Sequence, residues 1–231
     1  WGWAGAQSTP EGTFTSIGLG LFACSTRASD GGIECWGHVT EVSAPPGGEF
    51  ASVSVMEEHA CGLRTNGAAA CWGSYPVPEP VVQPPDGTFI SVSAGLSHGC
   101  GIREDRTVEC WGVNNGGQNF ASPPPGEFTS VSAGASFSCG LRPDQSVTCW
   151  STRSGYTTWQ PPPGRYTFVA SGYNNGCAVG ANGGAVCWGH DQWFDFTPPD
   201  GVFTAVSVEY DRACGLRINR TVECWGGQRE Q

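Results

Sequence analysis

The feature that most constrains this chain is the regular spacing of its cysteines. The 231 residues include 12 Cys in six pairs, whose members stand 11 residues apart in the first pair and 10 apart in the other five. The first members of successive pairs recur every 37 to 39 residues. Self-similarity at a fixed period of this length is typical of repeat architectures. The chain is therefore predicted to consist of six copies of one unit.

Other residues recur together with the cysteines. The second Cys of every pair is followed by Trp, and four of the pairs open with Cys-Gly-Leu-Arg or Cys-Gly-Ile-Arg. A Phe-x-Ser-Val-Ser segment and a proline-rich stretch also return along the chain. We expect one domain spanning 1–231. Its approximate repeats are 12–47, 48–86, 87–125, 126–163, 164–200 and 201–231.

Each unit is predicted to form short strands and no helix. The segment 128–132 alternates apolar and polar residues, which is the period of a half-buried strand. Asn66-Gly67 is a dipeptide that readily adopts the positive φ of a tight hairpin. In a hairpin centred on residue 66, Cys61 and Cys71 lie opposite each other, with Cβ atoms about 4.5–5.5 Å apart. That separation is close to what a disulfide requires.

We therefore predict one disulfide in each unit. Zinc is the rival use of paired cysteines, but it favours CxxC-type knuckles, which this spacing does not supply. We expect no metal and no cofactor. Disulfides persist in oxidising compartments, which favours a secreted or extracellular, cell-surface location. The predicted pairs are Cys24–Cys35, Cys61–Cys71, Cys100–Cys110, Cys139–Cys149, Cys177–Cys187 and Cys214–Cys224.

The charge and hydropathy of the chain argue against several classes of partner. The formal net charge is −10, and all 11 basic residues are Arg. Phosphate backbones repel such a surface, so we expect no nucleic-acid partner. No run of 18 apolar residues occurs, so we expect no membrane insertion. No signal-peptide pattern is expected in the chain either.

The repeated sequence motifs resemble those of the regulator-of-chromosome-condensation repeat family. They are Phe-x-Ser-Val-Ser-Ala-Gly, Cys-Gly-Leu-Arg and Val-x-Cys-Trp-Gly. Within it, the chain is most similar to the extracellular, disulfide-bearing branch of propeller-type β-lactamase inhibitory proteins and Crinkly-type receptor ectodomains. The resemblance implies an all-β fold, a single β-propeller of blades of about 38 residues. We expect six blades, with seven as the alternative. The segment 1–11 resembles an inter-repeat linker, so we expect it to complete the last blade and close the ring.

Binding residues are sought where the repeats differ, because recurring positions of a propeller mostly serve packing. The main variable tract precedes the first Cys of each pair and mixes aromatic, amide and charged side chains. We predict that this tract forms one rim of the propeller. The candidates are Phe22, His59, His98, Phe137, Tyr173, Asn175, Tyr210 and Arg212. A second variable tract follows each Trp-Gly and includes His38, Tyr75, Asn114, Tyr156, Trp159, His190 and Trp193.

The hypothesis for function is an extracellular binding or adhesion module that recognises a glycan or an extracellular protein through this rim. The alternative is a structural subunit of an extracellular coat, filament or cell-surface assembly, in which the chain self-associates. An enzyme or an enzyme inhibitor is a remote alternative, because no catalytic motif is found and every Cys is assigned to a disulfide. We expect no enzyme. Asn219 begins an Asn-x-Thr sequon and is a possible N-glycosylation site.

Overall fold

The computed structural model contains only strands and turns in the residues that it describes. No helix that could cross a membrane is found there. The described residues are 10–37, 44–73, 83–112, 122–151, 160–189, 197–210 and 212–227. The segment 1–9, most of the part predicted to complete the last blade, lies outside them, as does the second variable tract.

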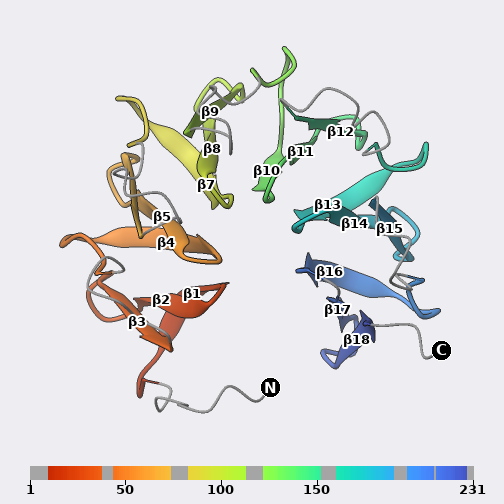
Figure 1. The fold of residues 1–231 in the computed structure, drawn as a ribbon, viewed down its shortest axis with the longest axis horizontal. Helices are drawn as coiled ribbons and strands as arrows, with labels where there is room; N and C mark the ends of the chain where they lie inside the picture. The colour runs from red at the N-terminus through yellow and green to blue at the C-terminus, as the bar shows by residue number, and fades with distance from the viewer. Residues whose placement is uncertain are drawn as a thin grey trace. The chain divides into compact units, whose positions relative to one another are not determined.

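The strands form six antiparallel sheets of three strands each, which we call blades 1 to 6 in chain order (Figure 1). In every blade the strand order follows the chain, so that the second strand lies in the middle. Blades 1 to 3 are β1 (Phe14–Leu19), β2 (Phe22–Arg27), β3 (Ile33–Gly37), β4 (Phe50–Met56), β5 (His59–Arg64), β6 (Ala69–Gly73), β7 (Phe89–Ala94), β8 (His98–Arg103) and β9 (Val108–Gly112). Blades 4 to 6 are β10 (Ser130–Ala133), β11 (Ser138–Leu141), β12 (Val147–Trp150), β13 (Tyr166–Ser171), β14 (Asn175–Gly180), β15 (Ala185–Gly189), β16 (Phe203–Val208), β17 (Arg212–Arg217) and β18 (Val222–Gly226).

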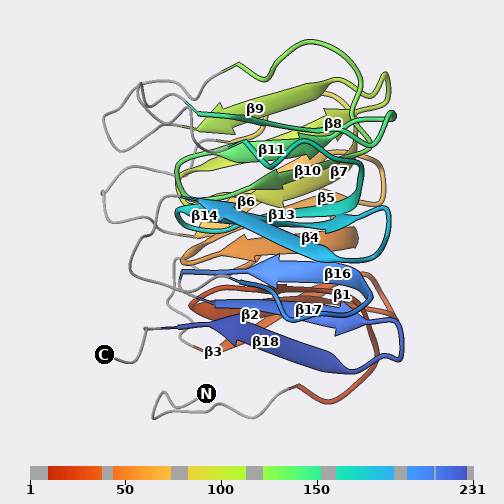
Figure 2. The same cartoon turned by 90° about the vertical axis from the view of Figure 1, so that its right-hand side faces the viewer.

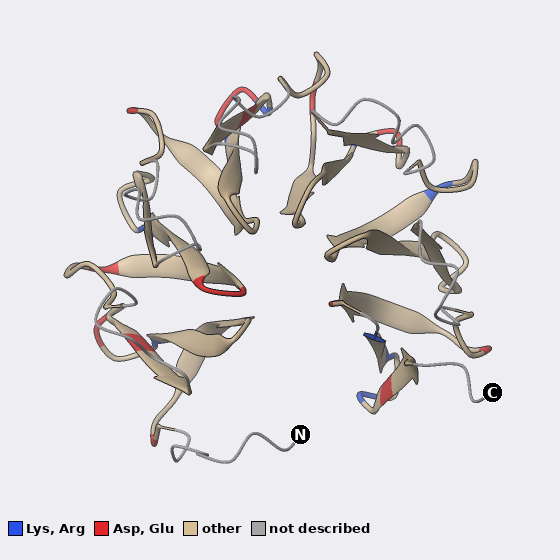
Figure 3. Ribbon diagram, in the orientation of Figure 1, with Lys and Arg blue, Asp and Glu red and all other residues tan. Residues whose placement is uncertain are grey.

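The blades fall into two compact units. The first comprises 1–104 and 109–120, and the second comprises 105–108 and 121–231. Consecutive strands of a blade run in opposite directions and are joined by short turns, as Figure 2 shows for β16, β17 and β18. Asp and Glu lie mainly in turns and near strand ends, so that the sheets carry little acidic charge (Figure 3).

The register of each blade brings its two cysteines together. Cys61 pairs directly with Cys71 across β5 and β6, with Cα atoms 4.1 Å apart. The same register and a disulfide recur in all six blades, and no described cysteine is free. The six predicted disulfides and the six predicted blades are therefore confirmed.

The recurring Gly, Trp and Arg serve packing inside each blade. In blade 2, a Cβ added to Gly62 would lie 2.6 Å from Cδ1 of Phe50, so only Gly allows the ring to lie against the strand. The ring of Phe50 also contacts Trp72 edge-on at 6.2 Å between centroids. The guanidinium of Arg64 stacks 4.6 Å above the same ring and donates to the Gly47 carbonyl. These side chains are therefore structural, as their regular recurrence indicates.

Neighbouring blades inside each unit join through apolar side chains and through hydrogen bonds from backbone amides to serine hydroxyls. Val53 and Trp72 of blade 2 belong to the same buried cluster as Cys24 of blade 1. The Val53 amide donates to Oγ of Ser16 at 3.1 Å. In the second unit, Ser171 of blade 5 donates its amide to Ser132 Oγ of blade 4 at 2.8 Å. Apolar contact supplies most of the stabilisation, and these hydrogen bonds fix the blade positions.

Candidate binding surface

The eight predicted rim residues lie at equivalent places, at or near the turn between the first and second strands of a blade. Five of them are buried: Phe22, His59, His98, Phe137 and Asn175. Tyr173 is half-buried, and Tyr210 and Arg212 are exposed. The structure therefore leaves three of the eight side chains accessible to a partner.

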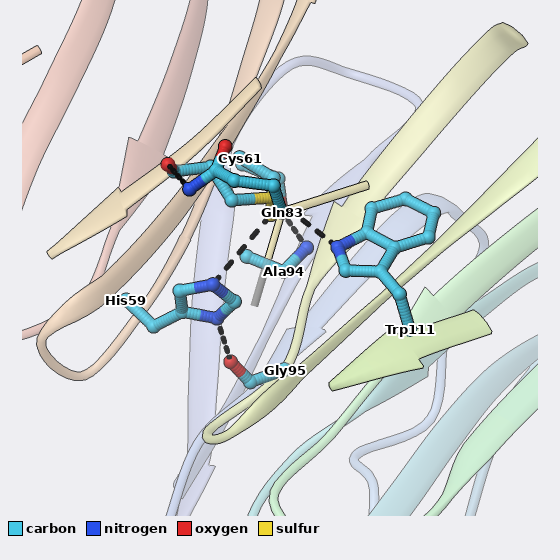
Figure 4. The surroundings of a disulfide bond; sticks show 8 residues. His59, Cys61, Gln83, Ala94, Gly95 and Trp111 are labelled. Atoms are coloured by element: carbon cyan, nitrogen blue, oxygen red, sulfur yellow. Dashed lines mark hydrogen bonds between the residues drawn. A yellow bond between two sulfur atoms is a disulfide. The ribbon is translucent and has the colours of Figure 1, made fainter. Parts of the chain in front are cut away.

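These side chains are buried because the loops of neighbouring blades pack against each other at this position. In Figure 4, the His59 ring lies beside the Cys61 disulfide, and its Nδ1 donates to the Gly95 carbonyl of blade 3 at 2.7 Å. In the second unit, the side-chain Nδ2 of Asn175 in blade 5 donates to the backbone carbonyl of Tyr210 in blade 6 at 3.1 Å. A pattern of variable residues could not reveal this, because variation in residue type does not report the direction of the side chain.

Burial also determines the charge state of the two histidines. Removal from water lowers the pKa of His59, although its hydrogen bond to Gly95 opposes this shift. Burial and the proximity of His59 lower the pKa of His98 to about 3. Both rings are therefore neutral at physiological pH, and in this state they pack and accept or donate hydrogen bonds rather than carry charge.

His59 also belongs to the one group of potential metal ligands found among the described residues. One ligand atom each from His59, Cys61 and Cys71 lies within 4.8 Å of the others. Both sulfur atoms are bonded to each other, however, and a metal requires thiolates. The Trp111 indole donates to Cys71 Sγ at 3.4 Å, and the Gln83 amide donates to the Cys71 carbonyl (Figure 4). These contacts enclose a disulfide and do not provide a metal site.

One accessible aromatic feature among the described residues of the second unit is a pair of tyrosines. Tyr173 lies in the turn between β13 and β14, and Tyr210 lies in the equivalent turn between β16 and β17. Their rings are stacked, with centroids 4.3 Å apart and an interplanar angle of 27°. Tyr210 remains 52% exposed. The sequence contained both residues, but their contact depends on the packing of blade 6 against blade 5.

The backbone around the tyrosine pair is held by hydrogen bonds. The Gly172 amide donates to the Asn175 carbonyl at 2.8 Å, and the Glu209 amide donates to the Arg212 carbonyl at 2.9 Å. These bonds close both turns, and the Asn175 side chain links one to the other. An ordered, exposed pair of aromatic rings provides contact area at little cost in conformational entropy.

A hollow on blade 1 is a further feature of the surface, and it was not predicted from the sequence. Its volume is about 390 Å³, and its lining comprises Pro10, Phe14, Thr15, Ser16, Ile17, Ser25 and Trp36. Ser25 Oγ is buried there without a hydrogen-bond partner. The sequence carried a signal for this hollow, because Ser25 stands where four other repeats have Gly after the first Cys.

Asn219 lies exposed in the turn between β17 and β18. Its Oδ1 accepts hydrogen bonds from the amide and the hydroxyl of Thr221, at 3.1 and 2.7 Å. The sequon is therefore at the surface, and its glycosylation stays a prediction.

Comparison with known proteins agrees with this geometry. The family model described as the regulator of chromosome condensation (RCC1) repeat matches residues 89–118, which include blade 3 and its disulfide. Residues 89–118 therefore form an RCC1-type repeat. No curated protein sequence matches it. The predicted resemblance to this repeat family is confirmed, and the six sheets are propeller blades.

Solved structures extend the likeness over most of the chain. The CRINKLY ectodomain of the Arabidopsis thaliana receptor kinase ACR4 is 26% identical with a TM-score of 0.73, covering 92% of this chain and 80% of its own. The ectodomain of the Physcomitrella patens receptor kinase CR4 is 25% identical with a TM-score of 0.75, covering 91% of this chain and 63% of its own. Yeast RCC1 (Prp20), solved bound to Kap60, is 13% identical with a TM-score of 0.68, covering 91% and 69%, and shares the fold alone.

Proposed function

We propose that this RCC1-type chain is an extracellular binding module whose contact surface includes the stacked Tyr173 and Tyr210. The observation that carries the proposal is the exposed, hydrogen-bonded tyrosine pair on otherwise regular blades. Exposed aromatic residues on ordered loops are common contact residues for sugars and for proteins. The partner is a glycan or an extracellular protein.

The extracellular location rests on two observations. Six disulfides in one chain are typical of proteins that fold in an oxidising compartment. The Arabidopsis and Physcomitrella structures that resemble this chain are receptor-kinase ectodomains. A location outside the cell is compatible with both classes of partner.

Arg212 adds directed chemistry beside the tyrosine pair. It begins β17 two residues after Tyr210, and it is exposed. Its guanidinium offers a planar set of donors that can bind a carboxylate in a bidentate manner. Partners with a carboxylate, such as an acidic sugar or an acidic protein loop, are therefore favoured over neutral ones.

The experiment that tests this proposal is a glycan array together with a pull-down from extracellular protein. Tyr210→Ala should weaken any ligand found by roughly tenfold or more, as removal of a central aromatic contact does. Tyr210→Phe keeps the ring and should bind nearly as well. Ile90→Ala, at an exposed position of β7 in the other unit, is the matched control. Unchanged binding by Tyr210→Ala and Tyr173→Ala would overturn the assignment.

A structural subunit is the second candidate function. The observation in its favour is a set of large apolar side chains that blade 1 and blade 6 expose, among them Ile17, Leu19 and Val222. Its test is the oligomeric state of the purified chain.

A further inference from the structure

The turn between β17 and β18 presents a side-chain amide nitrogen at the surface of blade 6. Asn219-Arg220-Thr221 is the only Asn-x-Ser/Thr sequence in the 231 residues. Asn219 is exposed, and its Oδ1 accepts hydrogen bonds from the amide and the hydroxyl of Thr221. Both bonds use the oxygen of the side-chain amide. Its Nδ2 is therefore left without a hydrogen-bond partner among the described residues.

The matching turn of blade 3 shows that the fold does not require this nitrogen. There the amide and the hydroxyl of Thr107 donate to Oδ1 of Asp105, at 2.9 and 2.7 Å. The middle residues of the two turns, Arg106 and Arg220, have φ angles of 66° and 68°. A carboxylate therefore closes the same turn as an amide does, and Asn219 adds only an exposed N–H donor.

This place on a blade stays open to solvent when another blade packs beside it. Asn66 of blade 2 and Asn182 of blade 5 stand at the position of Asn219, and both are exposed. The next blade packs against each of their turns, because the Phe89 amide donates to the Gly67 carbonyl and the Phe203 amide donates to the Gly183 carbonyl, both at 2.8 Å. The exposure of Asn219 therefore does not depend on what lies next to blade 6.

Two exposed apolar side chains lie beside Asn219. Ile218 is 69% exposed and Val202 is 46% exposed, and the Ile218 amide donates to the Val202 carbonyl at 3.1 Å. The same backbone bond in blade 2 joins Thr65 to Glu49 at 3.2 Å. Blade 6 thus has an apolar pair next to its turn where blade 2 has a polar pair.

We propose that Asn219 carries an N-linked oligosaccharide whose first sugars cover Ile218 and Val202. Asn-x-Thr in an exposed loop of a secreted protein is the acceptor sequence for this modification. A glycan is bulky and solubilising, and it removes the apolar pair beside its attachment point from water. Both the sequence of the turn and the residues around it are accounted for in this way.

The modification exchanges one bond for another. Nδ2 of Asn219 forms a bond with the anomeric carbon of an oligosaccharide whose donor is a lipid-linked diphosphate. The bond between that carbon and the diphosphate oxygen breaks, and the diphosphate leaves with the bonding electrons. Nδ2 loses one of its two protons to a base of the transferring enzyme. The carboxylate of Asp105 has no N–H group and is not an acceptor.

The inference rests on the extracellular location in the proposed function, because the donor acts in the secretory pathway, but not on the tyrosine pair. A chain that binds a ligand through the tyrosines and lacks the glycan would overturn this inference alone. The first test is peptide mapping by mass spectrometry of the protein purified from the cells that naturally produce it. The peptide that contains Asn219 should carry a glycan, and an amidase that removes N-linked glycans should leave Asp there. An unmodified Asn219 would overturn the proposal.

Two matched variants, secreted from cultured eukaryotic cells together with the wild type, test the role of the turn. Asn219→Asp keeps the turn acceptor, so it should lose the glycan and keep the circular dichroism spectrum of the wild type. Asp105→Asn creates a second Asn-Arg-Thr in the matching turn of blade 3 and should gain a second glycan. A glycan retained by Asn219→Asp would place the site elsewhere. A single glycan on Asp105→Asn would show that this turn does not present the acceptor.

Hydrophobic-interaction chromatography tests what the glycan covers. Removal of the glycan by the amidase should increase the retention of the wild type. The increase should be smaller for Ile218→Thr, which places at this position the residue type that blade 2 has at Thr65. Equal increases for the two proteins would overturn the assignment of Ile218 to the surface that the glycan covers.

Discussion

The buried His98 makes the stability of this protein depend on pH in a defined window. In the unfolded chain a histidine has a pKa near its usual value of about 6.5. In the folded protein, burial and the proximity of His59 lower the pKa of His98 to about 3. Above pH 6.5 both states are neutral and pH has no effect through this residue. As the pH falls below 6.5, the unfolded chain binds a proton that the folded protein does not, so stability is lost until about pH 3.

The magnitude follows from proton linkage. A difference of one bound proton changes the free energy of unfolding by about 1.4 kcal/mol per pH unit. Between pH 6.5 and 4.5, His98 therefore lowers the free energy of unfolding by on the order of 2.7 kcal/mol. Because native domains typically have a free energy of unfolding of only about 5–15 kcal/mol, a loss of this size is readily measured.

The perturbation is His98→Phe, because Phe22 and Phe137 occupy the same position in blades 1 and 4. Denaturant unfolding, followed by tryptophan fluorescence with the disulfides intact, is measured for both proteins at pH 7.5, 5.5 and 4.5. Carboxylates titrate in both proteins, so the quantity of interest is the difference between them. The wild type should lose about 1.4 kcal/mol more per pH unit below 6.5 than the variant. Parallel pH profiles would show that His98 is not the source of this pH dependence. His98→Asn provides a second neutral variant.

Two further predictions concern the blade itself. Gly140→Ala should lower the free energy of unfolding by about 1–3 kcal/mol, because the new Cβ would lie 2.4 Å from Cδ1 of Phe128. Gly47→Ala meets no atom within 4 Å and should stay within about 0.5 kcal/mol in the same urea titration. Replacing both Cys61 and Cys71 by Ser should lower the free energy of unfolding by about 2–3 kcal/mol, because their disulfide closes a short loop. A melting temperature equal to that of the wild type would contradict the last prediction.

The fold could be predicted from the sequence because the same pattern of residues recurs in six units. The spacing of Cys61 and Cys71 around a tight turn determines their register in a hairpin, and the same spacing returns in each unit. Trp72 and Arg64 could be recognised as structural because equivalents recur in other repeats. These are local patterns, and short-range geometry is enough to interpret them.

The candidate site was predicted less well because it depends on contacts between blades. His59, His98 and Asn175 vary in the way that a binding rim would vary, yet they are buried. The approach of Tyr210 to Tyr173 comes from the packing of two blades, about 37 residues apart in sequence. Variation along the repeats identifies which positions are free to differ, but only tertiary packing determines which of them reach the surface.

Hydrogen exchange can show directly whether the tyrosine pair is a contact surface. The protein would be measured free and with the ligand bound most tightly in the array or the pull-down. If ligand binds there, backbone amides in 172–175 and 209–212 should exchange more slowly, with little change in the turn 104–107. Protection confined to other segments, with both tyrosine turns exchanging as in the free protein, would contradict it.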